Sequence, residues 1–350
     1  MALGKITTTR LAAPFRSVAV GVSGGIDSAV TALLLKQKGF SLSGVFMRNW
    51  DDIDETGVCA ADQECDDAKW VCDKLNIPFY QVNFVKDYWN DVFSELIKDY
   101  ESGFTPNPDI LCNRDIKFNK FLFYAMNTLK VGAVATGHYA RSSFGNYLEH
   151  FSPGKNAKLL RPEDSNKDQT FFLSQIPQAA LQRTLFPLAD LTKKEVKQIG
   201  AENGFDRILM KKESTGICFI GHRKFQSFIS EAPGAGHPSL IANLMMTSKP
   251  YWIDQEPQYL KENGILNCFF RFQHIYDLDP CTIIKTSSGK LYVRLQKPEV
   301  ALTPGQYAVF YLGNECLGSA RIESTGPSLF TTNYEELLLE PALKEARKNG

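Results

Sequence analysis

Near its N-terminus the chain reads Val18-Ala19-Val20-Gly21-Val22-Ser23-Gly24-Gly25-Ile26-Asp27-Ser28. Apolar residues typical of a strand lead into a turn of small residues, and the apolar period of a helix begins at Ala29. Adjacent glycines let the backbone approach an anion closely, and the free N–H groups at a helix start donate to negative charge. This segment predicts a strand, a phosphate-binding loop and a helix.

The loop is not a Walker A loop, because no lysine follows its glycines to reach a phosphate. Ser23 and Ser28 add hydroxyl donors, whereas Asp27 would repel phosphate unless a cation such as Mg²⁺ lies between them. The sequence Ser-Gly-Gly-Ile-Asp-Ser resembles the pyrophosphate loop (PP-loop) of the N-type ATP pyrophosphatases, which split ATP into AMP and pyrophosphate. The alternative is a glycine turn of an ordinary α/β protein. The loop indicates ATP chemistry and does not name the substrate.

The composition is that of a globular protein of 350 residues, with 43% apolar and 22% charged residues and a formal net charge of zero. No apolar run approaches membrane-spanning length, so we predict no membrane helix and no membrane partner. Neutrality argues against indiscriminate polyanion binding but allows basic patches, such as Arg114, Lys117 and Lys120. Eight irregularly spaced cysteines predict reduced thiols rather than a disulfide framework or a zinc site.

Residues 1–16 contain three basic residues and no acidic residue, which suits an organellar transit segment; the alternative is a disordered extension. From residue 17 to about residue 140, strand and helix patterns alternate, which predicts a doubly wound parallel sheet within an ATP-binding catalytic domain of residues 17–160. The expected strands are 17–22, 41–47, 78–84 and 131–136, and the expected helices are 28–38, 62–76, 86–101 and 115–129. Ligands of such sheets lie beyond the carboxyl ends of the strands, which would place residues 23–28, Met47 and Gly137 around one crevice.

The rest of the chain predicts smaller regions. Residues 141–160 have no clear period and are interpreted as a surface insertion. A helical extension over 161–230 includes a capping box, Thr192 to Glu195, and a helix-ending Gly204. Residues 231–247 are a linker by composition, residues 248–330 predict a small β-barrel, and residues 331–350 a tail. The barrel strands are expected near 250–254, 265–273, 281–286, 290–296, 305–312 and 316–323.

Two loop motifs each contain a cysteine. The first is Thr105-Pro106-Asn107-Pro108-Asp109-Ile110-Leu111-Cys112-Asn113, in which two prolines stiffen the backbone. The second is Ser214-Thr215-Gly216-Ile217-Cys218-Phe219-Ile220-Gly221. Loop cysteines in a reduced protein are candidate nucleophiles, although each taken singly is more often inert. Beside a pyrophosphate loop, the two together indicate sulfur transfer.

With these motifs stand four others: Phe46-Met47-Arg48-Asn49-Trp50-Asp51, Ala135-Thr136-Gly137-His138-Tyr139-Ala140-Arg141, Lys167-Asp168-Gln169 and Leu302-Thr303-Pro304-Gly305-Gln306. In this order they resemble the tRNA-specific 2-thiouridylase family, over residues 17–230 and again in the barrel. The basic N-terminus, the insertion and the Phe46–Trp50 variant are most similar to the mitochondrial branch. The resemblance therefore implies a mitochondrial protein, with a cytoplasmic location as the alternative.

The resemblance implies a tRNA-uridine 2-sulfurtransferase that uses ATP, with Mg²⁺, to adenylate the C2 oxygen of the wobble uridine. Sulfur would arrive from a donor protein as a persulfide on Cys218. Cys112 would be the nucleophile and would finish in a disulfide with Cys218, which requires Cα atoms within roughly 7 Å in one state. Asp109 would act as an acid or base.

Residue by residue, the resemblance also implies the binding positions. The nucleotide would contact Gly21, Val22, Ser23, Gly24, Gly25, Ile26, Asp27, Ser28, Met47 and Gly137. The tRNA would contact Asn107, Pro108, Asp109, His138, Lys167, Asp168, Gln169, Arg271, Phe272 and Gln306. The structural alternatives are core packing for Met47 and Phe272 and a helix cap for Asp168.

One departure from the family concerns its central RNA-binding module, which Pro233–His237 replaces here. We therefore expect ATP binding to survive and tRNA affinity and turnover to be weakened. Two alternatives remain at this point: an amide-forming or C–N-forming ligase with the same loop, and a tRNA-binding form of the family with impaired catalysis.

Overall fold

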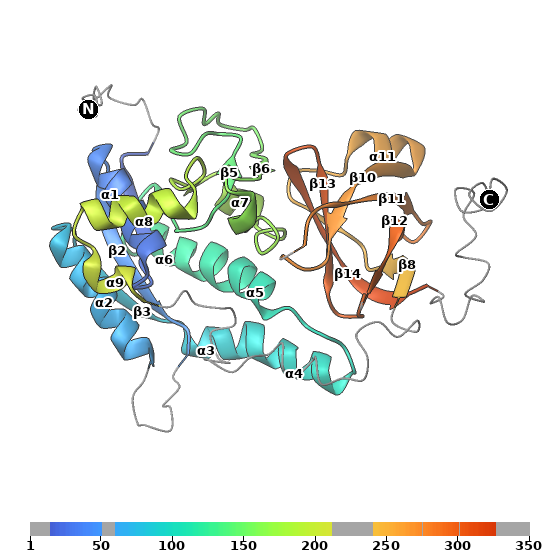
Figure 1. Cartoon of the computed structure of the whole chain (residues 1–350), viewed down its shortest axis with the longest axis horizontal. Coiled ribbons are helices and arrows are strands. Elements are labelled where there is room, and N and C mark those ends of the chain that lie inside the picture. Colours follow the sequence, from blue (N-terminus) through green and yellow to red (C-terminus); the bar gives the residue numbers. More distant parts are fainter. Residues whose placement is uncertain (1–14, 51–59, 212–240, 275, 301, 327–350) are drawn as a thin grey trace, which may run out of the picture. The chain divides into compact units, whose positions relative to one another are not determined.

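The computed structural model describes residues 15–50, 60–211, 241–274, 276–300 and 302–326 (Figure 1). The chain divides into two compact units. The first unit comprises Met1–Ser94, Pro108–Phe219 and Asn314–Cys316, and the second comprises Glu95–Asn107, Ile220–Gly313 and Leu317–Gly350. The segment before Pro108, although early in the sequence, thus belongs to the same unit as the C-terminal strands.

A parallel five-stranded sheet with the order β3-β2-β1-β4-β7 forms the centre of the first unit. Its strands are β1 (Ser17–Gly21), β2 (Ser41–Arg48), β3 (Phe79–Asn83), β4 (Ala133–Ala135) and β7 (Thr184–Leu185). Strand order reverses between β1 and β4, and ligands of doubly wound sheets bind where this reversal occurs. The predicted fold class is confirmed, and the crevice is expected beyond Gly21 and Ala135.

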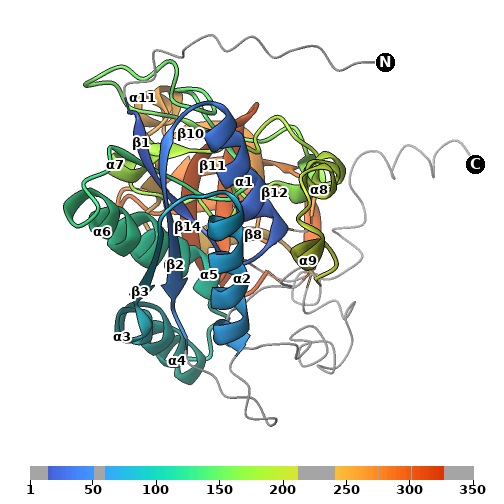
Figure 2. The same ribbon diagram turned by 90° about the vertical axis from the view of Figure 1, so that its left-hand side faces the viewer.

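Helices cover both faces of this sheet, with α1 and α2 on one face and α3, η2 and α6 on the other (Figure 2). Ala19 and Val45 of the sheet pack in one apolar cluster with Ile116 and Phe121. Central strands buried on both faces need continuous apolar residues, which explains the run at 18–20. The helices are α1 (Ile26–Gln37), α2 (Ala60–Lys74), α3 (Val85–Tyr88), η1 (Trp89–Phe93), α4 (Ser94–Glu101), α5 (Pro108–Leu111), η2 (Cys112–Phe121), α6 (Leu122–Asn127), η3 (Ser165–Lys167), α7 (Gln178–Leu181), α8 (Lys193–Glu202) and α9 (Asp206–Leu209).

The second unit contains a closed antiparallel barrel, in which the strands run β13-β10-β11-β12-β8-β14 and β14 pairs back with β13. Its core includes Phe270, Ile283, Val293 and Phe310, all fully buried. The elements are β8 (Ile241–Thr247), β9 (Tyr251–Trp252), α11 (Gln258–Asn263), β10 (Ile265–Arg271), β11 (Asp279–Lys285), β12 (Leu291–Val300), β13 (Tyr307–Leu312) and β14 (Glu315–Thr325). The predicted barrel is confirmed.

The structure corrects three details of the expected organisation. Residues 241–247, assigned to a linker by composition, form barrel strand β8. The surface insertion is anchored: β5 (Arg141–Ser142) pairs with β6 (Leu159–Leu160), and Phe144 and Leu148 are buried between them in sequence. Strand β7 was not expected, because two residues are too short to show a period.

The capping box of α8 is present as predicted, since Thr192 accepts from the Glu195 N–H and Glu195 accepts from the Thr192 N–H. Gly204 follows the helix in a left-handed conformation, with φ +70°. Within the described residues, no helix is long and apolar enough to cross a membrane.

Candidate functional site

The loop between β1 and α1 is shaped by its own serines and glycines. Ser28 Oγ accepts from the Ser23 N–H at 3.1 Å and donates to the Gly25 carbonyl at 3.0 Å. Gly24 has φ +72°, and a Cβ there would lie 2.5 Å from the carbonyl oxygen of Glu64. The loop passes so close to α2 that only glycine fits, which leaves its N–H groups unobstructed by a side chain at this point.

Two more predicted nucleotide residues lie at the same edge of the sheet. Met47, in β2, places its Cε 3.1 Å from where a Cβ of Gly21 would be. Gly137, directly after β4, comes so close to the start of α1 that its Cβ would lie 2.8 Å from the Ser28 nitrogen. The structure therefore brings the loop, Met47 and Gly137 together, as the strand pattern predicted.

Asp27 is paired with a lysine from a distant part of the sequence. Lys193 Nζ lies 2.7 Å from both Asp27 carboxylate oxygens, and the Tyr139 hydroxyl donates to Oδ1 at 2.9 Å. The Lys193 side chain is only 13% exposed, so it is held at this loop rather than spread in solvent. Asp27 was predicted to lie in the phosphate loop, whereas no local pattern indicated a role for Lys193 or for the hydroxyl of Tyr139.

The first turn of α8 positions Lys193. Thr192 caps the helix, and the Lys193 N–H donates to Asp164 Oδ2 at 2.8 Å. Gly200, further along α8, packs so closely on Ile26 of α1 that a Cβ would lie 2.4 Å from the isoleucine Cδ1. The capping box was a visible signal for the helix start, but only folding brings that start to the phosphate loop.

A second group of charges borders Gly24. Asp67 of α2, whose side chain is 1% exposed, forms ion pairs with Arg207 at 2.6 Å and with Lys211. Burial raises the pKa of the neighbouring Glu64, and the positive charge of Lys211 opposes this shift. These pairs join α9 to α2 beside the phosphate loop, and a buried carboxylate without such partners would be strongly destabilising.

Cys112 was expected in a loop, which was wrong: it lies where α5 continues into η2, a helix with i→i+5 hydrogen bonds. Such π-helical segments are rare and frequently occur at functional sites. Cys112 is 3% exposed and packs in the same apolar cluster as Tyr88 and Phe121. The next residue, Asn113, donates to the Asp109 carbonyl at 2.9 Å, and its buried Oδ1 has no partner among the described residues. Buried polar groups are nearly always hydrogen-bonded, so this oxygen is a candidate acceptor for a ligand.

Two titratable residues, Asp109 and His138, have shifted pKa values and both interact with the charge of Lys117. Burial raises the pKa of Asp109, and the positive charge of Lys117 partly opposes this. Burial also lowers the pKa of His138 well below its ordinary value, and Lys117 lowers it further. His138 Nδ1 lies 2.8 Å from Thr136 Oγ1. The positive charge of Lys117 thus acts both on Asp109, whose pKa is raised, and on His138, whose imidazole stays neutral. The sequence did not indicate this role of Lys117.

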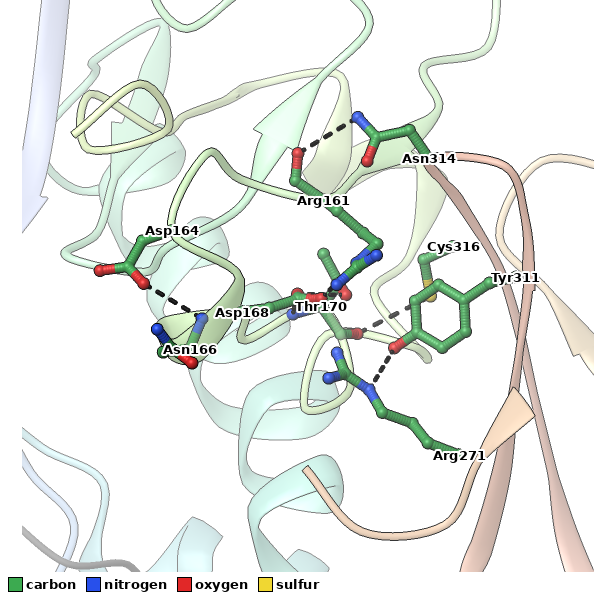
Figure 3. A network of polar contacts seen from close by, with 9 residues as sticks. All are labelled: Arg161, Asp164, Asn166, Asp168, Thr170, Arg271, Tyr311, Asn314 and Cys316. Carbon is green, nitrogen blue, oxygen red and sulfur yellow. Dashed lines mark hydrogen bonds and ion pairs between the residues drawn. The ribbon is translucent and has the colours of Figure 1, made fainter. Parts of the chain in front are cut away.

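Of the residues expected to contact tRNA from the first unit, Asp168 is turned inward (Figure 3). Its side chain is fully buried and accepts from Arg161 Nε at 2.8 Å and from the Thr170 N–H and hydroxyl at 3.0 and 2.6 Å. Asp168 thus makes structural hydrogen bonds within its own segment, whereas the side chain that caps η3 is that of Asp164. Gln169 Oε1 accepts from the Tyr139 N–H at 2.9 Å, which links this motif to the residue that contacts Asp27.

The barrel residues are also occupied within their own unit. Phe272 is 2% exposed and stacks on Phe270 with 6.3 Å between ring centroids, which agrees with the packing alternative. Arg271, 3% exposed, donates from Nε to the Tyr311 hydroxyl at 3.1 Å, as Figure 3 shows. Gln306 donates from Nε2 to the carbonyls of Thr105 and Pro106, at 3.1 and 3.3 Å.

The second predicted catalytic cysteine, Cys218, lies outside the described residues, as does the Pro233–His237 junction. The approach of Cys218 to Cys112 therefore stays a prediction. In the described ranges no group of three or more His, Cys, Asp or Glu side chains is arranged to hold a metal ion.

Family models match most of the chain. A model described as a tRNA methyl transferase HUP domain matches residues 16–222, and one described as an aminomethyltransferase beta-barrel domain matches residues 242–322. These descriptions refer to methyl transfer, whereas the curated relatives that match along almost their whole length are named for thiolation. The whole-length relatives are the more informative comparison, because they contain both regions together.

Three of these relatives represent the range. Mitochondrial tRNA-specific 2-thiouridylase 1 of Gallus gallus is 43% identical, over 90% of this chain and 93% of the relative. The human protein of the same name is 42% identical, over 90% and 92%. tRNA-specific 2-thiouridylase MnmA of Vibrio vulnificus is 36% identical, over 88% and 96%. The alignment with the chicken protein has 396 positions but covers only 90% of these 350 residues, so that relative carries residues without a counterpart here.

Proposed function

Because the chain belongs to the tRNA-specific 2-thiouridylase family, we propose that it replaces the C2 oxygen of a tRNA wobble uridine with sulfur, using ATP. The mitochondrial members, such as the chicken and human proteins, are the more similar ones, and the protein is accordingly assigned to mitochondria. The single observation that carries the proposal is the phosphate loop at the switch point of the sheet, closed by Gly137 and backed by Lys193.

The loop suits the pyrophosphate half of ATP. Its backbone donors lie at the N-terminus of α1, where the helix dipole favours negative charge. Asp27 by itself would oppose that charge, but Lys193 balances it at 2.7 Å. A Mg²⁺ ion in this family of sites would enter with the ATP phosphates and need one or two carboxylates at most, and Asp27 is the carboxylate on hand. The ion would supply further charge neutralisation of the phosphates.

The first chemical step follows from the poor leaving ability of a carbonyl oxygen. The uracil O2 attacks the α-phosphate of ATP, an O–P bond forms, and pyrophosphate leaves toward the loop at residues 22–28. The product is an adenylated uridine whose C2 is open to a sulfur nucleophile. Asp109, with its raised pKa, is a candidate to move a proton at this centre, and the lowered pKa of His138 keeps its imidazole neutral.

The second step transfers sulfur. A persulfide on Cys218, loaded by a donor protein, provides the terminal sulfur that bonds to C2, and AMP departs. Cys112 attacks the remaining sulfur–sulfur bond, so 2-thiouridine is released and a Cys112–Cys218 disulfide forms. An alternative order, in which Cys112 first releases hydrosulfide, gives the same products. In both orders the two cysteines lose two electrons to the transferred sulfur, and an external thiol must reduce the disulfide before another turnover.

The tRNA would be held by residues near the loop motifs, including Asn107, Pro108, His138, Lys167 and Gln169. Asp168 and Phe272 stay predicted tRNA positions, although each side chain is buried within its own unit. An anticodon base is already partly unstacked, so moving it into a pocket costs little. We propose that the shortened central region weakens tRNA affinity, consistent with the relatives' additional residues.

The decisive experiment is mass spectrometry of the wobble uridine after incubation of tRNA with ATP, a persulfide donor and the protein. A gain of sulfur in place of oxygen, accompanied by pyrophosphate release, supports the proposal. Cys112→Ser and Cys218→Ser should each abolish thiolation, with the half-exposed Cys65→Ser as the matched control that keeps it. A ligase using the same loop would tolerate both cysteine changes. A tRNA-binding form without catalysis would bind tRNA and release no pyrophosphate.

A further inference from the structure

The barrel makes a set of contacts with the segment that leads through Asn107 into helix α5. We define the clamp turn as residues Thr303–Gln306, between β12 and β13. Its Pro304 carbonyl accepts from the Thr105 N–H at 2.8 Å, while Gln306 donates to the carbonyls of Thr105 and Pro106. Both sides of this contact belong to the second unit, so the backbone just before Pro108 is attached to the barrel itself.

Gly305 shows how close this contact is. It has φ +97°, and a Cβ there would lie 2.7 Å from the Thr105 nitrogen and 2.9 Å from the Thr105 oxygen. The clamp turn is fixed in turn by the barrel, because the Gly305 N–H donates to the Ile322 carbonyl and the Ile322 N–H donates to the Gln306 carbonyl, both at 2.8 Å. The clamp turn is therefore hydrogen-bonded to strand β14, and residues 105–106 are hydrogen-bonded to the clamp turn.

The neighbouring residue of β14 adds a second attachment. Arg321 pairs with Asp99 of α4 at 2.5 Å, and its guanidinium lies 4.9 Å from the centre of the Phe104 ring. Asp99 is only 15% exposed in this pair. Arg321 of β14 thus holds the end of α4 and Phe104, and the clamp turn holds Thr105 and Pro106.

We propose that Gln306 is a positioning residue: through it the clamp turn fixes the backbone that leads into α5, the helix that carries Asp109 and continues to Cys112. Pro106 and Pro108 each fix their own φ angle. When the backbone of Thr105 and Pro106 is held, the chain up to Asp109 therefore keeps little conformational freedom. The Gln306 amide donates to protein carbonyls, which differs from the direct tRNA contact that the family resemblance implies. The inference rests on the proposed function for its catalytic consequence, but the attachment itself does not depend on it.

The test uses Gln306→Met, which keeps the length of the side chain, removes both donors and adds no charge. Gln296→Met, an exposed position on β12 of the same barrel, is the matched control. Three quantities are measured on the full chain: hydrogen exchange of the Thr105 amide, the single-turnover rate of wobble-uridine thiolation at saturating tRNA and ATP, and the Kd for tRNA.

For Gln306→Met we expect exchange of the Thr105 amide to rise about tenfold, because the bonds beside it are lost. We expect the single-turnover rate to fall roughly 10- to 100-fold, since small misplacements of reacting groups carry costs of that size. The Kd for tRNA should change less than about twofold, in contrast to a phosphate or base contact. Gln296→Met should leave all three unchanged. A weakened tRNA Kd with an unaltered saturated rate and unaltered exchange would overturn the inference.

Asp99→Asn provides an independent test, because it weakens the ion pair with Arg321 and leaves Gln306 and the clamp turn unchanged. It should shift exchange and rate in the same direction as Gln306→Met, and an effect confined to Gln306→Met would count against the clamp. If the wild-type chain fails to thiolate tRNA, the proposed function fails. The exchange of the Thr105 amide in the two variants then still decides whether the clamp turn holds the backbone of Thr105 and Pro106.

Discussion

Lys193 Nζ lies 2.7 Å from both carboxylate oxygens of Asp27, although 166 positions separate the two residues in the sequence. Lys193 supplies, from the start of α8, a positive charge that the glycine loop itself lacks. It also removes the repulsion that Asp27 would otherwise exert on a phosphate. The nucleotide site is therefore assembled from two ends of the first unit rather than from one contiguous motif.

Replacing Lys193 should weaken ATP binding. For Lys193→Met we expect the Kd for ATP, measured by calorimetry, to rise about 10- to 100-fold, because hydrogen bonds to charged groups contribute roughly 1.5–3 kcal/mol. Lys194→Met is the matched control, since its side chain is exposed and it occupies the next position of the same helix. Equal Kd values for the two variants would show that Lys193 serves only to pair Asp27.

Gly24→Ala should damage the phosphate loop more than an equivalent change elsewhere. Alanine at φ +72° incurs a strain of about 1–2 kcal/mol, and its Cβ would also collide with the Glu64 carbonyl at 2.5 Å. Gly39→Ala shares the strain, with φ +85°, but its Cβ meets open space. Thermal unfolding should therefore show both losses, whereas ATP titration should show a loss of affinity for Gly24→Ala alone.

His138 should make the protein less stable in acid. Its pKa is held well below its ordinary value by burial and by Lys117, so the folded protein leaves the imidazole neutral. As pH falls below about 6.5 the unfolded chain binds a proton that the folded chain refuses, and stability declines by up to about 1.4 kcal/mol per pH unit. In His138→Gln the decline of Tm between pH 7 and 5 should be shallower. The exposed His150→Gln should reproduce the wild-type slope.

Asp109 and Lys117 should be coupled in the pH dependence of thiolation. If Asp109 acts as a base, the rate rises with pH through its raised pKa, and Asp109→Asn should cost about 10²- to 10⁴-fold in rate. Lys117→Met removes the charge that lowers this pKa, so the acid limb of the pH–rate profile should move to higher pH. Lys120→Met, on the same helix but paired with Asp87 and Asp91, is the control. An unmoved acid limb in Lys117→Met would exclude Asp109 as the group responsible.

Most of the first-unit sheet was predictable, because local patterns are strong there. The run Val18–Val20 and the glycines after it determine a buried strand and a phosphate loop, and Thr192 with Glu195 determines a helix start. Element ends were less certain, and β7 and β8 were missed. Strand β7 has two residues, and β8 follows a stretch whose glycines and prolines obscure its period.

The sequence alone was sufficient to identify the pyrophosphate loop, the candidate cysteines and the family, since these depend on residue types at short spacings. Folding decided which side chains distant in the sequence come together, such as Lys193 at Asp27 and Gln306 at Thr105. Such pairings depend on how strands and helices stack in three dimensions, and a local pattern of hydrophobicity or charge carries no record of them.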